Sequence, residues 1–462
     1  MTTYRVEKDS MGEMRVPQEA YYGAQTQRAV ENFQISQYRF SRHFIEALGE
    51  IKRCGAEVNG QKGWIDPKIA QAIVAAATEV VEGKWDPQFV LDVFQTGSGT
   101  STNMNANEVI ANRATEILGG AMGSKKVHPN DHVNFGQSSN DVFPTAMHLS
   151  LLNVLKRNTI PSLEKLGSQL ANKAKAFDKI VKMGRTHLQD ATPIRLGQVF
   201  SGYAAQVAQS VARLKGVMEP LGELALGGTA VGTGINSPKG FAKEVIARIA
   251  KRMDLSLGEA KNHFAAQGAK DAIVEASGTL KTTAVALMKV ANDIRWLGSG
   301  PRCGIGEIRL PETQPGSSIM PGKVNPVIAE SLTMVCAQVI GNDVTVTIAG
   351  QSGNFELNVM MPVMIHNVLE SAQLLAKASE NFRVKCVEGI EADEKRCQEM
   401  IEKSLAMCTS LAPKIGYDQA AAIAKEAYKT GKTVREVAKE KKILSEAELE
   451  KILDPWRMTE PD

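Results

Sequence analysis

Apolar residues recur at helical spacing over long stretches in the middle of the chain. One stretch begins at Pro193 and has steps of mostly three and four residues, at Leu196, Phe200, Tyr203, Val207, Leu214 and Val217. Another has strict steps of seven with alanines between them, at Ile273, Leu280, Leu287 and Ile294. Such stripes are typical of long helices that pack against one another in a bundle. At 1.5 Å per residue, each of these helices would be roughly 35 to 40 Å long.

Further stretches bring the number of predicted long helices to about five. The first follows Asn140 or Asp141, either of which can cap a helix with Pro144 in its first turn, and it runs to a break at Pro161. Two more are predicted downstream, over residues 326–349 and 355–379. Strand-like alternation is scarce, so the pattern predicts a mainly α protein with a central long-helix bundle.

The two ends of the chain differ from this middle part. Short helical patterns and loops alternate near the N-terminus, where buried helices are predicted over residues 70–81 and 109–118. After Glu391 the chain is charged and rich in alanine, and capping-box signals pair Thr433 with Glu436 and Ser445 with Glu448. We therefore predict three domains, over residues 1–137, 138–390 and 391–462.

Composition narrows the class of protein without identifying it. The 462 residues are 43% hydrophobic and 23% charged, which is ordinary for a soluble protein with a large core. A net charge of +3 gives no reason to expect nucleic acid or a membrane as a partner. Six scattered cysteines, a charged N-terminus and the lack of an obvious apolar run of bilayer length favour the cytoplasm.

The most unusual local chemistry lies in residues 316–325, which we term the signature loop. It holds two hydroxyls between Gly316 and Gly322, followed by an ammonium group and a carboxamide. Asn325 followed by Pro326 predicts that a helix begins there. Helix starts attract anions. A phosphate-binding loop is disfavoured, because five residues separate Gly316 from Gly322 and Val324 replaces the magnesium-binding hydroxyl. A flexible surface linker is the remaining alternative.

Other polar segments supply proton-transfer groups and hydrogen-bond donors. Residues 184–190 are predicted as a loop between a helix ending near Lys182 and one beginning near Pro193, and they contain His187. Histidine is the residue type best suited to exchange protons at physiological pH. A loop histidine taken alone is more often structural. The small residues around Gly97 suggest either a tight turn or a backbone that approaches a ligand closely. A metal site at residues 128–132 is disfavoured because no second ligand cluster accompanies it.

The signature loop resembles that of the fumarase/aspartase superfamily, and the resemblance extends from residues 23–27 to residues 415–418. It implies three mostly α domains whose central bundles, from four subunits, pack into a tetrameric helical core. Active sites would be shared between three subunits of the homotetramer. The implied reaction is reversible hydration of fumarate to (S)-malate, a step of the tricarboxylic acid cycle, by acid/base catalysis without metal or other cofactor.

The resemblance also assigns roles to residues. Ser317 would take the carbon-bound proton as an oxyanion, although a histidine would be the first choice of base from chemistry alone. His187 and Glu330 would form a dyad that handles the water. Donors for the dicarboxylate substrate would be Ser98, Gly99, Thr100, Ser138, Ser139, Asn140, Thr186, Ser318, Lys323, Val324 and Asn325. A secondary anion site would use Lys125, His128, Asn130 and Asp131.

Two residues depart from the superfamily pattern: the change at Lys125 keeps the charge but loses the bidentate fork that would bind the second anion, and the change at Phe135 is mild. Lys125 stands where related sequences often have arginine, and Phe135 with Gly136 stands where they usually have lysine and a small residue. Two alternatives remain, an aspartate ammonia-lyase and a non-catalytic helical scaffold. The presence of His187, and of Ser139 beside Ser138, favours a hydratase, and the intact reactive residues disfavour a scaffold.

Overall fold

The computed structural model of the chain describes residues 3–461. Helices dominate, and each sheet within these residues is a single pair of strands. The predicted mainly α fold class is therefore confirmed.

Residue contacts divide the chain into two compact units. The first unit comprises Met1–Pro161, Ala212–Ala284 and Ala337–Ala376, and the second comprises Ser162–Val211, Val285–Cys336 and Lys377–Asp462. The longest helices contribute residues to both units. The predicted domain boundaries, after residues 137 and 390, stay a prediction.

Long helices form in the stretches with apolar stripes. They are α5 (Ser139–Val154), α6 (Ile160–Ala176), α7 (Leu196–Gly216), α11 (Asp271–Leu297), α12 (Val327–Gln351) and α13 (Met361–Lys385). Polar pairs join neighbouring helices inside each unit. In the first unit, Asp343 of α12 accepts hydrogen bonds from Ser277 and Lys281 of α11, at 2.7 and 2.5 Å. In the second unit, the Tyr203 hydroxyl of α7 donates to Asp293 of α11 at 2.9 Å.

Several predicted helix ends were wrong, each for a local reason. The predicted break at Pro161 is absent: a π-helical turn, Leu155–Thr159, joins α5 to α6, and Pro161 lies in the first turn of α6, where a missing N–H is tolerated. Helix α5 is capped by Ser138 instead of Asn140 or Asp141. Helix α13 begins later than predicted, because a short hairpin of β8 (Gly353–Asn354) and β9 (Leu357–Asn358) precedes it.

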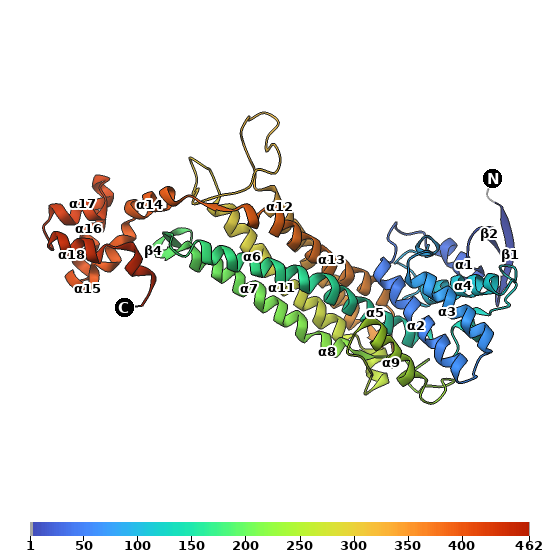
Figure 1. The fold of residues 1–462 in the computed structure, drawn as a ribbon. Helices are drawn as coiled ribbons and strands as arrows, with labels where there is room; N and C mark the ends of the chain where they lie inside the picture. The colour runs from blue at the N-terminus through green and yellow to red at the C-terminus, as the bar shows by residue number, and fades with distance from the viewer. Residues whose placement is uncertain (1–2, 462) are drawn as a thin grey trace. The chain divides into compact units, whose positions relative to one another are not determined.

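The N-terminal part of the first unit is built from β1 (Tyr4–Asp9), β2 (Gly12–Pro17), α1 (Ala24–Asn32), α2 (Arg42–Gln61), α3 (Pro67–Val81) and α4 (Thr100–Ile117) (Figure 1). Helix α3 confirms the helix predicted over residues 70–81, and Asp66 caps it. Helix α4 starts nine residues before the helix predicted from residue 109 and is buried over most of its length. Downstream follow α8 (Met218–Leu221), β5 (Glu223–Leu224), α9 (Phe241–Met253), β6 (Gly258–Glu259) and α10 (His263–Gly268).

In the second unit, the chain after Glu391 forms a small helical layer. It contains α14 (Glu394–Lys403), α15 (Ala412–Ile415), α16 (Tyr417–Thr430), α17 (Val434–Glu440) and α18 (Glu446–Ile452). Both predicted capping boxes, at Thr433 and Ser445, are confirmed. A hairpin of β3 (Val181–Thr186) and β4 (Gln189–Arg195) and a pair of β7 (Ile308–Arg309) with β10 (Glu391–Ala392) complete the unit's sheets.

Helix α12 has the length and the composition of a membrane-spanning helix. Among the described residues it is the one helix that is long and apolar enough to cross a membrane, by length and composition only. Within its most apolar part, 39% of the residues are buried. Its apolar residues are interrupted by Glu330, Asn342 and Asp343, so α12 is not an uninterrupted apolar run. Core helices of soluble proteins have the same composition, and Asp343 in the middle of α12 is held by two donors of the first unit.

Candidate functional site

The segment at residues 98–100 forms the tightly packed start of α4. Gly99 is the N-cap residue and has a left-handed backbone, with φ of 73°. A Cβ atom at Gly99 would lie 2.1 Å from the ring of Phe143, and one at Gly97 would lie 1.7 Å from the carbonyl oxygen of Val359. The hydroxyls of Ser98 and Thr100 are 2.9 Å apart. The segment is thus a tight turn whose backbone has no room for a side chain at either glycine.

The segment at residues 138–140 forms the start of α5. Ser138 Oγ accepts from the Asn140 N–H at 3.2 Å, and the Asp141 carboxylate accepts from the Ser138 N–H at 2.9 Å. Asp141 is fully buried and also accepts from the amides of Gly227 and Thr229. Burial raises the pKa of Asp141, while these hydrogen bonds and the Lys52 charge oppose the rise. The turn is therefore fixed from inside the protein.

The structure brings these two helix-start segments, residues 98–100 and 138–140, together within the first unit. Asn103, one turn into α4, donates to Ser139 Oγ at 3.0 Å. Asn140 Nδ2 donates to the carbonyl oxygen of Ala230 at 2.8 Å, which fixes the direction of its side chain. Two helix N-termini with neutral donors therefore lie side by side, an arrangement that suits an anionic ligand.

His187 lies at the tip of the β3–β4 hairpin, so the prediction of a loop between helices was wrong. Helix α6 ends at Ala176, before the strands, and α7 begins three residues after Pro193, which lies in β4. Thr186 pairs with Gln189, and the two turn residues between them, His187 and Leu188, have left-handed φ values of 56° and 61°. Such a turn matches the twist of a hairpin but is sterically costly for residues other than glycine.

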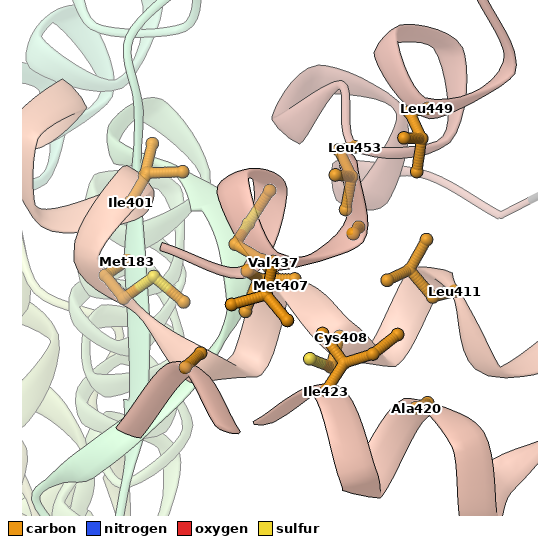
Figure 2. Packing of buried hydrophobic residues seen from close by; sticks show 13 residues of the cluster. Met183, Ile401, Met407, Cys408, Leu411, Ala420, Ile423, Val437, Leu449 and Leu453 are labelled. Carbon is orange, nitrogen blue, oxygen red and sulfur yellow. The ribbon is translucent and has the colours of Figure 1, made fainter. Parts of the chain in front are cut away.

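The base of this hairpin is anchored by a buried carboxylate and by an apolar cluster. Glu307 has no exposed surface, and it accepts a bidentate pair of hydrogen bonds from Arg185 at 2.9 and 3.0 Å. Lys182 Nζ lies 3.1 Å from the same carboxylate. Figure 2 shows Met183 of β3 packed among the buried residues of the C-terminal helices, including Ile401 and Met407. These contacts hold the exposed His187 on a rigid support.

The signature loop folds back on itself ahead of α12. Asn325 Nδ2 donates to the carbonyl oxygen of Gly316 at 2.5 Å, so the Asn325 side chain closes the loop instead of capping the helix as predicted. Helix α12 begins at Val327, with the Pro326 carbonyl accepting from the Glu330 N–H. The loop lines a hollow of about 420 Å³, in which Ser317, Lys323 and Val324 take part.

The Ser317 hydroxyl oxygen has two amide donors. It accepts from the N–H of Met320 at 3.0 Å and from the N–H of Ile319 at 3.3 Å. Ser318 and Lys323 are exposed, and Glu330 is half-buried in the first turn of α12. Among the described residues of the single chain, no hydrogen bond joins Ser317, His187 and Glu330 to one another. These three, with Thr186 and the rest of the signature loop, belong to the second unit.

Three of the four residues of the predicted secondary anion site, all but Asp131, line a cavity of about 250 Å³ in the first unit. Lys125, His128 and Asn130 line it together with Lys8 and Asp9 of the first hairpin. Lys125 Nζ donates to the Lys8 carbonyl at 2.7 Å. His128 Nδ1 accepts from two backbone amides, those of Asn130 and Asp131, so its Nε2 is the ring nitrogen left for a ligand. Among the described residues, no group of three or more metal-ligating side chains is gathered.

Sequence reasoning missed one set of residues beside the helix-start segments. Lys52 of α2 is fully buried and donates to Asn134 and Gln137, at 2.8 and 3.0 Å. The available signal was the run of alternating asparagines at positions 103, 105 and 107, which is unusual in a helix buried on most sides. Buried amides of this kind are kept where they hold other polar groups in place.

Comparison with known proteins covers the whole chain. A family model described as lyase matches residues 12–341, and one described as fumarase C C-terminus matches residues 407–460. A class II fumarate hydratase of Halobacterium salinarum is 56% identical over 456 residues, which are 99% of this chain and 97% of the relative. The mitochondrial fumarate hydratase of Saccharomyces cerevisiae is 53% identical over 100% of this chain and 95% of its own. The crystal structure of a class II fumarase from Schistosoma mansoni matches with a TM-score of 0.96 at 43% identity, covering 98% of this chain and 99% of that one.

Proposed function

We propose that the chain is a hydro-lyase that interconverts fumarate and (S)-malate in the tricarboxylic acid cycle, because it belongs to the class II fumarate hydratase family. The observation that carries this function is identity above 50% with curated fumarate hydratases over essentially the full length of both chains. Residue roles are inferred from the local geometry together with this family membership.

Ser317 is our proposed base for the proton on C3 of malate. A serine hydroxyl is a weak acid, so its anion needs donors that are already in place. The N–H groups of Ile319 and Met320 point at Ser317 Oγ, and they would stabilise that anion as they now stabilise the lone pairs of the hydroxyl. Lys323 lies in the same loop and lines the same hollow, so it adds positive charge.

His187 and Glu330 are our proposed pair for the water molecule. In the direction of hydration His187 removes a proton from the attacking water, and in the reverse direction it protonates the departing hydroxyl. The rigid hairpin presents His187 to solvent, and Glu330 lies at a helix start that favours its negative charge. We infer that the two side chains meet in the assembled protein, where Glu330 would raise the basicity of the imidazole.

Neutral donors would hold the two carboxylates of the substrate. Such donors bind a dianion without burying an excess of opposite charge. We assign this role to the helix-start segments, to Thr186 and to part of the signature loop, that is to Ser98, Gly99, Thr100, Ser138, Ser139, Asn140, Thr186, Ser318, Lys323, Val324 and Asn325. The cavity lined by Lys125, His128 and Asn130 is our proposed secondary anion site, with Asp131 next to it in the sequence.

A homotetramer with active sites shared between three subunits is the proposed assembly. Helix α12 leaves large apolar side chains exposed in the single chain, and Met334 is 68% exposed and Val344 56%. Apolar faces of this size are normally covered by a partner.

The remaining proposals concern cofactors and location. The residue roles above use neither a metal nor another cofactor, and we expect activity to survive prolonged treatment with a chelator. All six cysteines are free thiols, five of them buried, which suits a reducing compartment such as the cytoplasm. The yeast relative, in contrast, is named as mitochondrial.

An ultraviolet assay of the purified protein tests the proposed function. Fumarate absorbs through its double bond. Absorbance should therefore fall when fumarate is added without ammonia, and it should rise when malate is added instead. Loss of absorbance only in the presence of ammonia would instead indicate an aspartate ammonia-lyase. No change under either condition would indicate a non-catalytic scaffold.

A further inference from the structure

A buried polar cluster connects the two helix-start segments within the first unit. Its members are Lys52 of α2, Asn103 and Asn107 of α4, Asn134, and Ser139 at the start of α5. Lys52, Asn103 and Asn107 have no exposed surface. Only Ser139 has a role in the reaction proposed above. The other four bring charge and amides into the interior, where each polar group that lacks a partner is costly.

The contacts of Asn134 fix the direction of its amide. Its Nδ2 donates to the carbonyl oxygen of Gln137 at 3.1 Å, which can only accept. Its Oδ1 therefore faces the cluster, where it accepts from Lys52 Nζ at 2.8 Å and from Asn103 and Asn107, each at 3.2 Å. Burial lowers the pKa of Lys52 to about 7, and its nitrogen carries enough hydrogens to donate in either protonation state.

Asn103 must consequently present its NH₂ group to Asn134. Turning the amide around would place two oxygen atoms against each other. The second hydrogen of the same NH₂ group is donated to Ser139 Oγ at 3.0 Å. This orientation leaves Asn103 Oδ1 buried with no hydrogen-bond partner among the described residues. A buried oxygen without a hydrogen-bond partner is energetically costly. The two hydrogen bonds of the NH₂ group therefore determine the orientation of the Asn103 side chain.

Ser139 is left with its own hydroxyl hydrogen to donate. A serine hydroxyl has one hydrogen and two lone pairs, and its hydrogen rotates to suit the available partners. Because Asn103 donates to one lone pair, the hydrogen cannot point toward Asn103. No described residue accepts it. Ser139 is partly exposed, so this hydrogen is free for solvent or for a ligand at the start of α5, where the helix dipole favours an anion.

We propose that Asn103 is a positioning residue that turns the Ser139 hydroxyl hydrogen toward a carboxylate of the substrate. Lys52 and Asn103 both donate to Asn134, and this shared acceptor holds Asn103 in the orientation in which it also donates to Ser139. The hydrogen-bonded cluster therefore extends from the interior to the binding segment. The inference rests on the proposed function and deepens it, because it assigns a direction to one of the substrate contacts. A hydrogen bond already aimed at a carboxylate needs no reorganisation when the substrate binds.

Helix α4 supplies a matched control for this inference. Asn107 lies one turn beyond Asn103, is equally buried and donates to the same oxygen at the same distance, but it does not contact Ser139. We expect Asn103→Ala to raise KM for fumarate and malate roughly tenfold with kcat within about twofold, since about one charge-assisted hydrogen bond is misdirected. Asn107→Ala should change KM less than about twofold while lowering thermal stability similarly.

A second variant and a double-mutant cycle keep the test decisive if Asn103→Ala folds poorly. Asn103→Asp has nearly the same shape but accepts hydrogen bonds, so it would capture the Ser139 hydrogen and should also raise KM. In a Ser139→Ala background, the effect of Asn103→Ala or of Asn103→Asp on KM and on inhibition by succinate should disappear. Equal KM values for the Asn103→Ala and Asn107→Ala variants, or an undiminished effect without the Ser139 hydroxyl, would overturn the inference alone. An inactive wild-type protein would overturn it together with the proposed function.

Discussion

The helix-start segments and the signature loop carry similar donors but are held in opposite ways. Asn103, Asp141 and the carbonyl of Ala230 fix residues 138–140, and the ring of Phe143 packs against Gly99. The signature loop is largely exposed, and the hydrogen bonds of its side chains are made within the loop itself, as in the one from Asn325 to Gly316. One region is therefore supported by the core, and the other mainly by its own backbone.

The difference suggests a division of labour in the proposed reaction. Donors that bind carboxylates work best when they are preorganised, because they then pay no ordering cost when the ligand arrives. A group that transfers a proton has to reach the reacting carbon after the substrate has entered, and loops that close can also exclude water. Loss of the proton-transfer group of the loop, Ser317, should therefore affect turnover, whereas changes in the helix-start segments should affect binding or folding.

The largest expected effect tests the signature loop. Ser317→Ala removes the proposed carbon base while it leaves the carboxylate donors in place. We expect kcat to fall by about 10² to 10⁴, with KM largely kept. Exchange of the C3 hydrogen of malate with solvent, followed by NMR, should fall by the same factor. The neighbouring Ser318→Ala serves as the control and should mainly raise KM. Near-normal C3 exchange in the Ser317 variant would remove it from the role of base.

A second large effect is expected at the hairpin tip. His187→Asn removes the group that handles water, and asparagine tolerates the left-handed backbone observed at this position. Hydration should fall by about 10² or more. C3 exchange from malate should persist better than hydration, because Ser317 can still take the proton, provided that the carbanion returns to malate faster than it decays. The roles of the two residues would be reversed if exchange is lost here and retained in the Ser317 variant.

Two glycines sharpen the comparison of rigidity. Gly99 and Gly322 both have left-handed backbones, with φ of 73° and 78°. A Cβ atom at Gly99 would clash with Phe143, whereas one at Gly322 would meet nothing within 4 Å. We expect Gly99→Ala to cost about 2 to 5 kcal/mol, from overpacking and backbone strain together, and Gly322→Ala only about 1 kcal/mol. Thermal unfolding of the two variants gives the comparison, and equal losses would contradict it.

The comparison also shows what sequence pattern can and cannot predict. The stripes at Leu196 and Ile273 predicted α7 and α11 because burial repeats along a helix, and the composition of the signature loop marked it as chemically unusual. The hairpin that carries His187 was not predicted. Its anchors are Glu307, which lies more than a hundred residues away in sequence, and the apolar cluster around Met183. Pairings over such separations leave no periodic signal.

The contact between Asn103 and Ser139 was missed for a related reason. The two residues are 36 positions apart, and neither type is unusual at a helix start. The capping-box pattern correctly predicted the helix caps at Thr433 and Ser445. Local rules misplaced the cap of α5, because Ser138, Asn140 and Asp141 are all good capping residues and the buried Asp141 decides between them. Competition among equivalent local signals is settled by tertiary contacts.

The smallest expected effect concerns pH and the buried lysine behind the helix-start segments. Burial lowers the pKa of Lys52 from an ordinary 10.5 to about 7. Between these pH values the unfolded chain binds more protons at this site than the folded chain, so this lysine makes stability rise with pH across that window. The slope for one proton is at most about 1.4 kcal/mol per pH unit.

Replacement of Lys52 should remove its contribution to the rise of stability with pH. We expect the unfolding temperature of Lys52→Met to rise less steeply between pH 7 and 10 than that of the wild-type protein. Lys270 is the matched control, because its pKa is also lowered to about 7 by burial while it donates to carbonyl groups around α10. Lys270→Met should lose a similar part of the slope, but only Lys52→Met should raise KM, by about two- to fivefold, because only Lys52 holds Asn134. If the dependence of the unfolding temperature on pH is unchanged in both variants, neither lysine deprotonates in this range. If KM is unchanged in Lys52→Met, Asn134 keeps its orientation without the lysine.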